Sequence, residues 1–221
     1  MNESKTKYMS MNISSKEEET PLMSLSGIAI DKVDDFVYLG SWVANTERDF
    51  KVRKAKAWVS CHRMKNIWKS NLPTELKKRL FIATVESILL YGSETWTVTK
   101  EISKKIDGCY SRMLRMALNI DWKAHITNKE VYGNLPRVTT KIQERRMRLA
   151  GHLTRHDDLV AHKLVLWEPN HGKRSPGRPR ITFVDVLRKD TGLDSTTELK
   201  ALMDDRVLWR RSIDIRTKYP P

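Results

Sequence analysis

Hydrophobic residues recur at helical spacing over most of the chain, beginning with a basic stretch between Arg48 and Lys69. Its apolar positions are spaced by four, three and four residues, which places them on one face of a helix: Ala57, Cys61, Met64 and Trp68. The same stretch carries eight Lys or Arg residues and one acid. Arg53, Lys56 and Arg63 lie together on another face, so the sequence predicts an amphipathic helix with a cationic side.

Two further helices are expected before residue 120. The first follows Pro73, since proline is tolerated at a helix start, and it ends at Gly92. Its expected buried positions are Leu76, Leu80, Ala83, Thr84, Ile88 and Tyr91. The second runs from Glu101 to Leu118. Its expected buried stripe is Ile102, Ile106, Cys109, Tyr110, Met113 and Ala117.

Two capping boxes, which are sequence signatures of a helix start, follow at Thr127-x-x-Glu130 and Thr140-x-x-Gln143. The helix after the second box has an apolar face formed by Ile142, Leu149 and Leu153. A cationic stripe lies about 100° away and consists of Lys141, Arg145, Arg148, His152 and Arg155. Like charges at this spacing repel by a few tenths of a kcal/mol per pair, so the stripe predicts an anionic partner.

Beyond the stripe, an apolar segment covers residues 159–167, and residues 168–180 break regular structure with three Pro and two Gly. A short helix is expected near Thr182–Asp190, with Gly192 beyond it. Ser195-x-x-Glu198 then predicts the start of a last helical pair that ends at Trp209.

The proline-rich segment contains PGRPR at 176–180. A proline-stiffened Gly-Arg-Pro arm has the shape to insert its arginine into a narrow minor groove. The segment resembles an AT-hook core, with Pro176 where that motif usually has arginine. A basic interdomain linker is an equally good interpretation, and a nuclear localisation role is a weaker one.

Alternation typical of strands is confined to the start of the chain, at Ile28–Ile30 and Phe36–Trp42, and predicts a small β-hairpin. The expected fold class is therefore mainly α: a small N-terminal β-hairpin followed by a helical bundle and a second helical region. The expected domains cover residues 1–45, 46–125 and 126–221.

The charge is distributed unevenly along the 221 residues, whose formal net charge is +14. Residues 1–47 carry 4 Lys or Arg against 8 Asp or Glu, whereas residues 48–221 carry 37 against 19. This asymmetry indicates a polyanionic partner, namely RNA, DNA or an RNA–DNA hybrid. A membrane-surface helix is disfavoured because the basic faces lack wide flanking Phe and Leu stripes.

Two features bear on the compartment. No apolar run approaches the roughly 18 residues that span a bilayer, and no signal-peptide pattern opens the chain. Cys61 and Cys109 lack the Cys-x-x-Cys spacing and are expected to be buried and reduced. We therefore expect a nuclear or cytoplasmic protein that is not secreted.

Two short patterns have partial metal-binding character. Asp34-Asp35 could belong to a two-metal site, but no third carboxylate is identifiable. His152 and His156 have a suitable spacing, but the segment HLTRH lacks the glutamate of the HExxH motif and is rich in arginine. We expect no metal site and no catalytic residue in this chain.

Several segments resemble, in family order, the C-terminal part of endonuclease–reverse transcriptases of non-LTR (LINE-type) retrotransposons, particularly the RTE-like group. The segment NESKTKYM at 2–9 is similar to a lysine-bearing palm motif, and FVYLGS at 36–41 is similar to the primer-grip hairpin. Residues 51–96, which end in LYGSETW, resemble the thumb. The C-terminal domain is matched by RMRLAGHLTRHDD at 146–158, GKRSPGRPR at 172–180 and DRVLWR at 205–210.

The resemblance implies a palm remnant over 1–45, a thumb-like bundle over 46–125 and a basic C-terminal domain over 126–221, all belonging to an RNA-directed DNA polymerase. It implies that the nucleotide- and primer-binding residues are Lys5, Lys7, Tyr38, Leu39 and Gly40. Together with the basic faces, it indicates as nucleic-acid-binding residues Arg53, Lys54, Lys56, Arg63, Lys141, Arg145, Arg148, Arg155, Lys173, Arg174, Arg178 and Arg180.

One departure from the family changes the expected activity. The family's catalytic Asp-Asp pair precedes the lysine motif and is not in this sequence, and Asp34-Asp35 follows that motif. Because phosphoryl transfer needs a carboxylate-held metal, Mg²⁺ in the full-length family enzyme, we expect a non-catalytic polypeptide without a cofactor. Its protein partner would be the palm and fingers of the parent polymerase. The alternatives are a stand-alone basic nucleic-acid-binding protein and a degenerate remnant without function.

Overall fold

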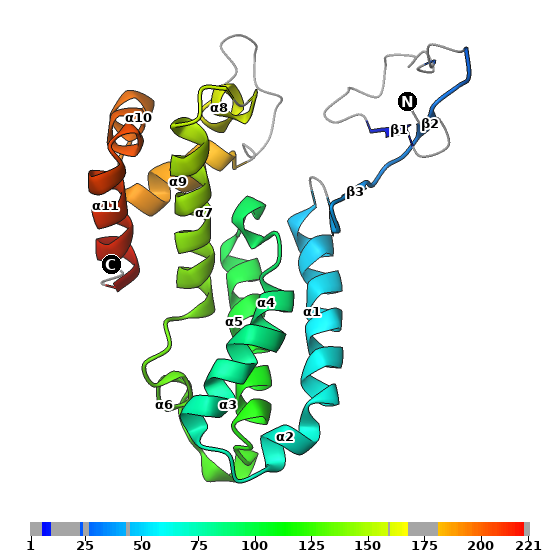
Figure 1. The fold of residues 1–221 in the computed structure, drawn as a ribbon, viewed down its shortest axis with the longest axis vertical. Helices are drawn as coiled ribbons and strands as arrows, with labels where there is room; N and C mark the ends of the chain where they lie inside the picture. The colour runs from blue at the N-terminus through cyan, green and yellow to red at the C-terminus, as the bar shows by residue number, and fades with distance from the viewer. Residues whose placement is uncertain are drawn as a thin grey trace. The chain divides into compact units, whose positions relative to one another are not determined.

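The computed structural model describes residues 6–9, 23, 27–42, 45–158, 160–167 and 181–218. These residues are mainly helical, with short strands only near the N-terminus (Figure 1), which confirms the expected fold class. The chain divides into two compact units, Met1–Asp49 and Phe50–Pro221.

The first unit contains two short pairs of strands. Strand β1 (Lys7–Tyr8) pairs in parallel with β2 (Asp31–Lys32), and β3 (Val37–Tyr38) pairs antiparallel with β4 (Ser41–Trp42). The predicted hairpin is therefore present, but it lies entirely within the segment expected to be one strand. The chain reverses at Leu39 and Gly40, whose φ angles are 47° and 82°. Two consecutive positive φ values give the turn a twist that suits a two-residue hairpin.

Asp49 ties this hairpin to the start of helix α1 (Thr46–Arg63). Its carboxylate accepts hydrogen bonds from Ser41 Oγ at 2.8 Å and from the Trp42 backbone N–H at 3.2 Å. Arg48 forms an ion pair with Asp35 and places its guanidinium 3.8 Å from the centroid of the Trp42 ring. The strand-to-helix connection is thus held by polar contacts within one unit.

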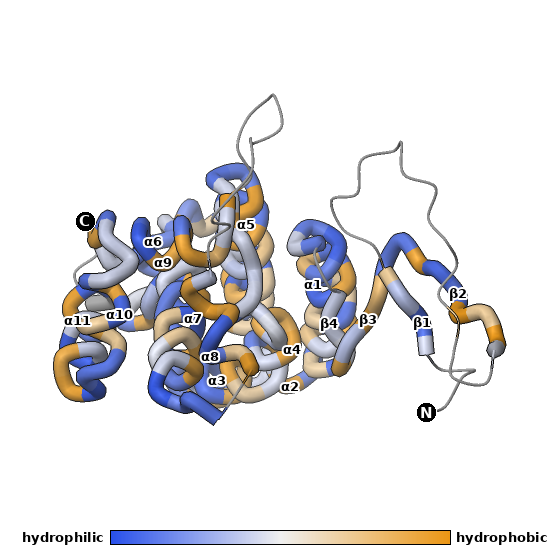
Figure 2. The backbone as a smooth tube through the Cα atoms, turned by 90° about the horizontal axis from the view of Figure 1, so that it is seen from above, coloured by the Kyte–Doolittle hydropathy of each residue, from blue (hydrophilic) through white to orange (hydrophobic). Residues whose placement is uncertain are grey.

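The second unit begins with a helical bundle built around one hydrophobic core. After α1, its helical elements are α2 (Lys65–Lys69), α3 (Thr74–Phe81), a π-helical turn (Ile82–Glu86), α4 (Ser87–Leu89), a 3-10 turn (Ser93–Thr95), α5 (Lys100–Ala117), a second 3-10 turn (Trp122–Ala124) and α6 (Asn128–Tyr132). Hydrophobic and hydrophilic stretches alternate along the helices of this unit (Figure 2), as expected of helices that bury one face.

Two of the predicted helix faces are confirmed by burial. Ala57, Cys61 and Trp68 are fully buried, although the predicted single helix is interrupted at Met64 between α1 and α2. The Trp68 indole donates a hydrogen bond to the Cys61 carbonyl at 2.9 Å across this interruption. In α5, every residue of the predicted stripe is buried: Ile102, Ile106, Cys109, Tyr110, Met113 and Ala117.

The face predicted for the helix between Pro73 and Gly92 is only partly correct, since Leu80 and Ile88 pack against the first core without being fully buried. Leu76 and Tyr91 are 38% and 47% exposed, whereas the buried residues are shifted along the sequence: Lys77, Phe81, Val85, Glu86, Leu89 and Leu90. The π-helical turn inserts extra backbone into this helix, and a wider turn rotates the residues that follow. Because the segment is apolar around much of its circumference, periodicity could not choose between neighbouring faces.

A second hydrophobic cluster holds the rest of the unit together. Its helices are α7 (Val138–Thr154), α8 (Val160–Val165), α9 (Phe183–Thr191), α10 (Thr196–Asp204) and α11 (Arg206–Lys218). Helix α7 belongs to both cores, since Val138 and Ile142 are buried in the first and Met147 and Ala150 in the second. The two cores of this unit therefore share one continuous helix.

Helix ends follow the predicted capping chemistry at several sites. Thr127 and Glu130 form a complete capping box at the start of α6, and Ser195 accepts a hydrogen bond from the Glu198 N–H at the start of α10. The expected box at Thr140 is wrong, because α7 begins at Val138 and Thr140 lies inside its first turn. The described helices include none long and apolar enough to span a bilayer.

Candidate nucleic-acid interface

The cationic face predicted for α1 lines a surface groove. The groove has a volume of about 730 Å³ and lies between α1 and the segment that contains α4. Arg53, Lys56 and Arg63 line it together with the apolar side chains of Val59 and Ile88. We call this the α1 groove. The structure thus brings together three of the predicted nucleic-acid-binding residues.

Tyr91 completes the α1 groove, although the sequence predicted that it would be buried. Its ring is 47% exposed, and the Arg53 guanidinium carbon lies 4.1 Å from the ring centroid. Arg53 itself is only 7% exposed. This cation is therefore fixed against the aromatic ring, whereas Lys56 and Arg63 are exposed. A groove with exposed cations along an exposed ring suits a nucleic-acid strand, since bases stack on aromatic faces.

Lys54 does not line the α1 groove. Its side chain is half-buried, and its ammonium lies 5.9 Å from the centroid of the Phe50 ring. The structure thus separates Lys54 from Lys56 and Arg63.

The first residue of the α7 stripe, Lys141, has a partner inside the protein. Its ammonium lies 2.5 Å from a carboxylate oxygen of Glu86, which also accepts a hydrogen bond from the Tyr110 hydroxyl at 2.6 Å. Glu86 lies in the π-helical turn and is 4% exposed. Burial and the neighbouring Glu86 carboxylate raise the pKa of Tyr110, so this phenol stays protonated as a donor.

Arg145 also has an internal partner. It donates a hydrogen bond from Nη1 to the Leu90 carbonyl at 2.8 Å. Lys141 and Arg145 therefore fasten α7 to the segment between the π-helical turn and Leu90. The prediction that the stripe is an uncompensated ladder needing an external anion is wrong for Lys141, because the buried Glu86 carboxylate neutralises its charge. Arg145 is engaged inside the protein, but its partner is a neutral carbonyl.

Arg146 follows Arg145 in the sequence but was not predicted as part of the stripe, and it is 4% exposed. Its Nε and Nη2 atoms contact Asp190 Oδ2 at 2.8 and 2.7 Å, and Nη1 donates to the Trp96 carbonyl at 3.1 Å. Burial raises the pKa of Asp190, and the Arg146 charge opposes that rise. Arg146 thus joins α7 to α9 and to the end of the LYGSETW segment, so its role is structural.

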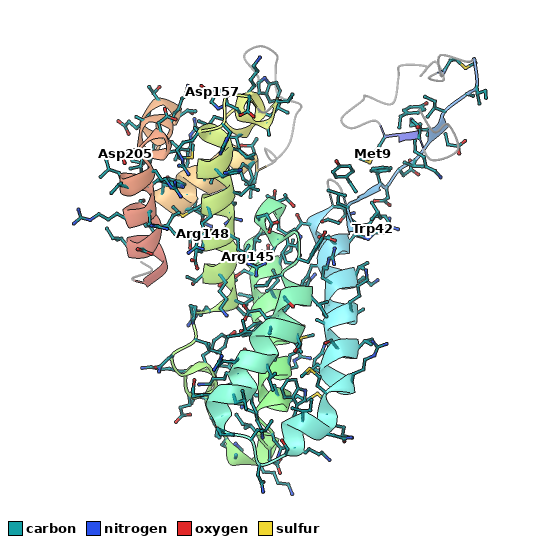
Figure 3. The ribbon with its side chains drawn as sticks, viewed as in Figure 1. Met9, Trp42, Arg145, Arg148, Asp157 and Asp205 are labelled. Carbon is teal, nitrogen blue, oxygen red and sulfur yellow. The ribbon has the colours of Figure 1, made fainter. Side chains whose placement is uncertain are left out.

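Two other stripe residues, Arg148 and Arg155, lie at the surface that α7 shares with α11. Arg148 is 68% exposed and pairs with Glu144 at 2.5 Å, and Arg155 donates from Nη1 to the Met203 carbonyl at 2.7 Å. Figure 3 labels Arg145 and Arg148, which lie one turn apart on α7. The predicted stripe is therefore divided between two surroundings, one internal and one at the α7–α11 surface.

The predicted primer-binding residues occupy the first unit. Lys7 is exposed in β1, while Tyr38 and Leu39 are 62% and 74% exposed at the hairpin turn beside Gly40. Exposure of a tyrosine and a leucine at a turn leaves them accessible to a partner. Some predicted residues lie outside the described residues: Lys5, Lys173, Arg174, Arg178 and Arg180.

The two patterns with partial metal-binding character have neighbours within the protein. Asp35 of the acidic pair forms an ion pair with Arg48, and the His152 and His156 rings are tilted by 56° with centroids 4.3 Å apart. Among the described residues, no group of three His, Cys, Asp or Glu side chains could hold a metal ion. Cys61 and Cys109 are buried and free, as predicted, and burial raises the pKa of Cys61 to about 11.

Comparison with known proteins gives one similarity. The chain is 27% identical over 195 residues, or 81% of its length, to an uncharacterized transposon-derived protein of Caenorhabditis elegans, of which the match covers 70%. No family model matches the chain. No solved structure matches it either. The similarity agrees with a transposon origin, which the resemblance found in the sequence also implies.

Proposed function

We propose that this chain descends from the C-terminal part of a non-LTR retrotransposon reverse transcriptase and binds primer–template nucleic acid through its second unit. The similarity to a transposon-derived protein supports the origin. The α1 groove carries the binding proposal, because Lys56 and Arg63 there are exposed beside an aromatic ring. The Tyr38–Gly40 turn of the first unit would contact the primer, by resemblance to the primer grip.

The proposed contacts are directed to phosphates. Lys56 and Arg63 are seven residues apart on α1, so they lie on nearly the same side of the helix about 10 Å apart along its axis. Such a pair follows a phosphate backbone without reading base edges, which gives affinity without sequence preference. Tyr91 offers a ring surface for a base, and stacking of this kind tolerates any base.

The activity proposed for residues 1–221 is nucleic-acid binding. By the resemblance, the Asp-Asp pair of the family would precede the lysine motif, and the metal ion that it holds would supply the chemistry of polymerisation. Within the proposal, residues 1–221 hold the nucleic acid.

A double substitution tests the proposal on the full chain. Lys56→Ala with Arg63→Ala should weaken binding to a 20-base-pair RNA–DNA hybrid about tenfold and should lower the salt dependence by about two phosphate contacts. Fluorescence anisotropy at several salt concentrations measures both quantities.

The matched control is Lys51→Ala with Lys104→Ala. Both lysines are exposed and neither lines the α1 groove, so this variant loses the same formal charge. Equal losses in the two variants would show a diffuse charge effect and contradict the groove as the binding surface.

A further inference from the structure

Four arginines from two helices far apart in the sequence line one groove at the α7–α11 surface. Arg148 and Arg155 come from α7, and Arg206 and Arg210 come from α11. The groove has a volume of about 210 Å³ and is also lined by Trp209, Ile213 and Asp214. We call it the arginine groove. The sequence predicted two of its four cations and missed the two on α11.

Close packing of α11 on α7 creates the arginine groove. Trp209 is 2% exposed, and its indole N–H donates to the Met147 carbonyl at 2.9 Å. Gly151 makes this approach possible, because a Cβ at that position would overlap the Trp209 indole. Arg206 and Arg210 flank the anchoring tryptophan four residues apart, so both lie on the side of α11 that faces the groove.

The arginine groove carries more positive charge than its surroundings neutralise. Arg148 has Glu144 as its ion-pair partner, but Arg155 donates to a neutral carbonyl. Arg206 and Arg210 are exposed, and no ion pair with another described residue neutralises either of them. The lining includes a single carboxylate, that of Asp214. Neighbouring like charges repel, and a bound anion would relieve that repulsion.

The residue type indicates which anion fits. All four cations are arginines, whose planar guanidinium donates several hydrogen bonds in a fixed geometry and matches phosphate oxygens in pairs. A volume of about 210 Å³ is large enough for a phosphate group. Against these four arginines stand the Asp214 carboxylate in the lining and Glu144, which pairs with Arg148.

We propose that the arginine groove is a phosphate-binding site, separate from the α1 groove. Two sources share this chemistry: the backbone of a nucleic-acid strand and a free phosphate ion. We favour the nucleic-acid backbone, because the proposed function already requires a nucleic-acid strand. This choice rests on the proposed function. The chain would then hold nucleic acid at two places, with Arg206 and Arg210 as the residues that only the folded structure brings into contact with the strand.

The test replaces the two arginines of α11 in the full chain. Arg206→Ala with Arg210→Ala should weaken binding of a 20-base-pair RNA–DNA hybrid about tenfold and reduce the salt dependence by about two contacts. The matched control, Lys200→Ala with Arg211→Ala, removes two exposed cations outside the groove from α10 and α11. It should change affinity by twofold at most. Circular dichroism verifies that each variant keeps its helices.

A calorimetric titration with inorganic phosphate alone distinguishes the two sources. Heat that appears with the wild type and disappears in the Arg206→Ala/Arg210→Ala variant would show that free phosphate suffices. Loss of hybrid affinity without any phosphate heat would assign the site to a nucleic-acid backbone.

Two outcomes would overturn the inference. One is equal hybrid affinity in the groove and control variants, with no phosphate heat. In that case a loss confined to Lys56→Ala/Arg63→Ala would leave the proposed function standing. The other is a wild type that binds neither the hybrid nor inorganic phosphate, which would remove both proposals. Phosphate heat that depends on Arg206 and Arg210 would support the site even if the hybrid does not bind.

Discussion

Glu86 is a carboxylate buried among apolar residues, and its two partners explain how it is tolerated. Tyr110 donates a hydrogen bond at 2.6 Å, and the Lys141 ammonium lies at 2.5 Å. A buried charge is costly unless it is paired and hydrogen-bonded. The contact joins three segments: the π-helical turn, α5 and α7. This contact is one of those that attach α7 to the first core.

Replacing Glu86 alone should therefore destabilise the fold. Glu86→Gln leaves the half-buried Lys141 ammonium without its counter-ion, and the expected loss is about 3 kcal/mol of unfolding free energy. Urea denaturation followed by circular dichroism measures it. Glu86→Gln combined with Lys141→Met should cost less than the sum of the two single changes, because the pair is removed together. Additive losses would show that the two residues do not interact.

Neither Glu86 nor Tyr91 could be placed from the sequence. Glutamate is ordinarily exposed and tyrosine is intermediate in burial, whereas here Glu86 is 4% exposed and Tyr91 is 47% exposed. The buried face is already shifted at Lys77 and Phe81. Beyond them comes the π-helical turn, which hydrophobic periodicity does not reveal because it assumes a constant 100° per residue.

The packing of α11 on α7 depends on a glycine at position 151. Gly151 lies in α7 under the Trp209 indole, with no room for a Cβ, whereas Gly108 lies in α5 with nothing within 4 Å of the position a Cβ would take. Both are helical glycines, so they share the same intrinsic penalty relative to alanine. Their surroundings differ, and the pair makes a matched experiment.

Gly151→Ala should lower the unfolding free energy by about 2 kcal/mol or more, since overpacking a close contact forces α11 away from α7. Gly108→Ala should instead raise it by roughly 0.5–1 kcal/mol through helix propensity. Urea titrations of both variants provide the comparison. If Gly151→Ala is as stable as the wild type, the close packing of Trp209 on α7 is not a feature of the protein in solution.

Most element boundaries could be predicted because their signals are local. Thr127 and Glu130 form the expected box, Gly192 ends α9 with a φ of 66°, and the α5 stripe is buried as its spacing indicates. The start of α7 was predicted three residues late because Val138 follows an arginine without a side-chain cap. The helix that includes Trp209 also continues to Lys218 rather than ending there.

The distribution of positive charge over the folded protein decides which cations can contact a polyanion. The sequence alone indicated a polyanion partner, but it could not show which cations are free to meet one. Lys141, Arg145 and Arg146 are engaged inside the second unit, while Lys56 and Arg63 line one groove and Arg206 and Arg210 line another. The arginine groove depends on tertiary packing between α7 and α11, which no local pattern specifies.

The salt dependence of hybrid binding tests whether the protein binds nucleic acid through contacts to phosphates. Affinity of the full chain for a 20-base-pair RNA–DNA hybrid, measured by fluorescence anisotropy between about 50 and 300 mM salt, should fall linearly on a log–log plot. The predicted slope is about −3 to −5, since roughly four to six cations in the two grooves would each release counter-ions. A hybrid that does not bind at about 50 mM salt, or binds with an affinity independent of salt, would contradict phosphate-directed binding by this protein.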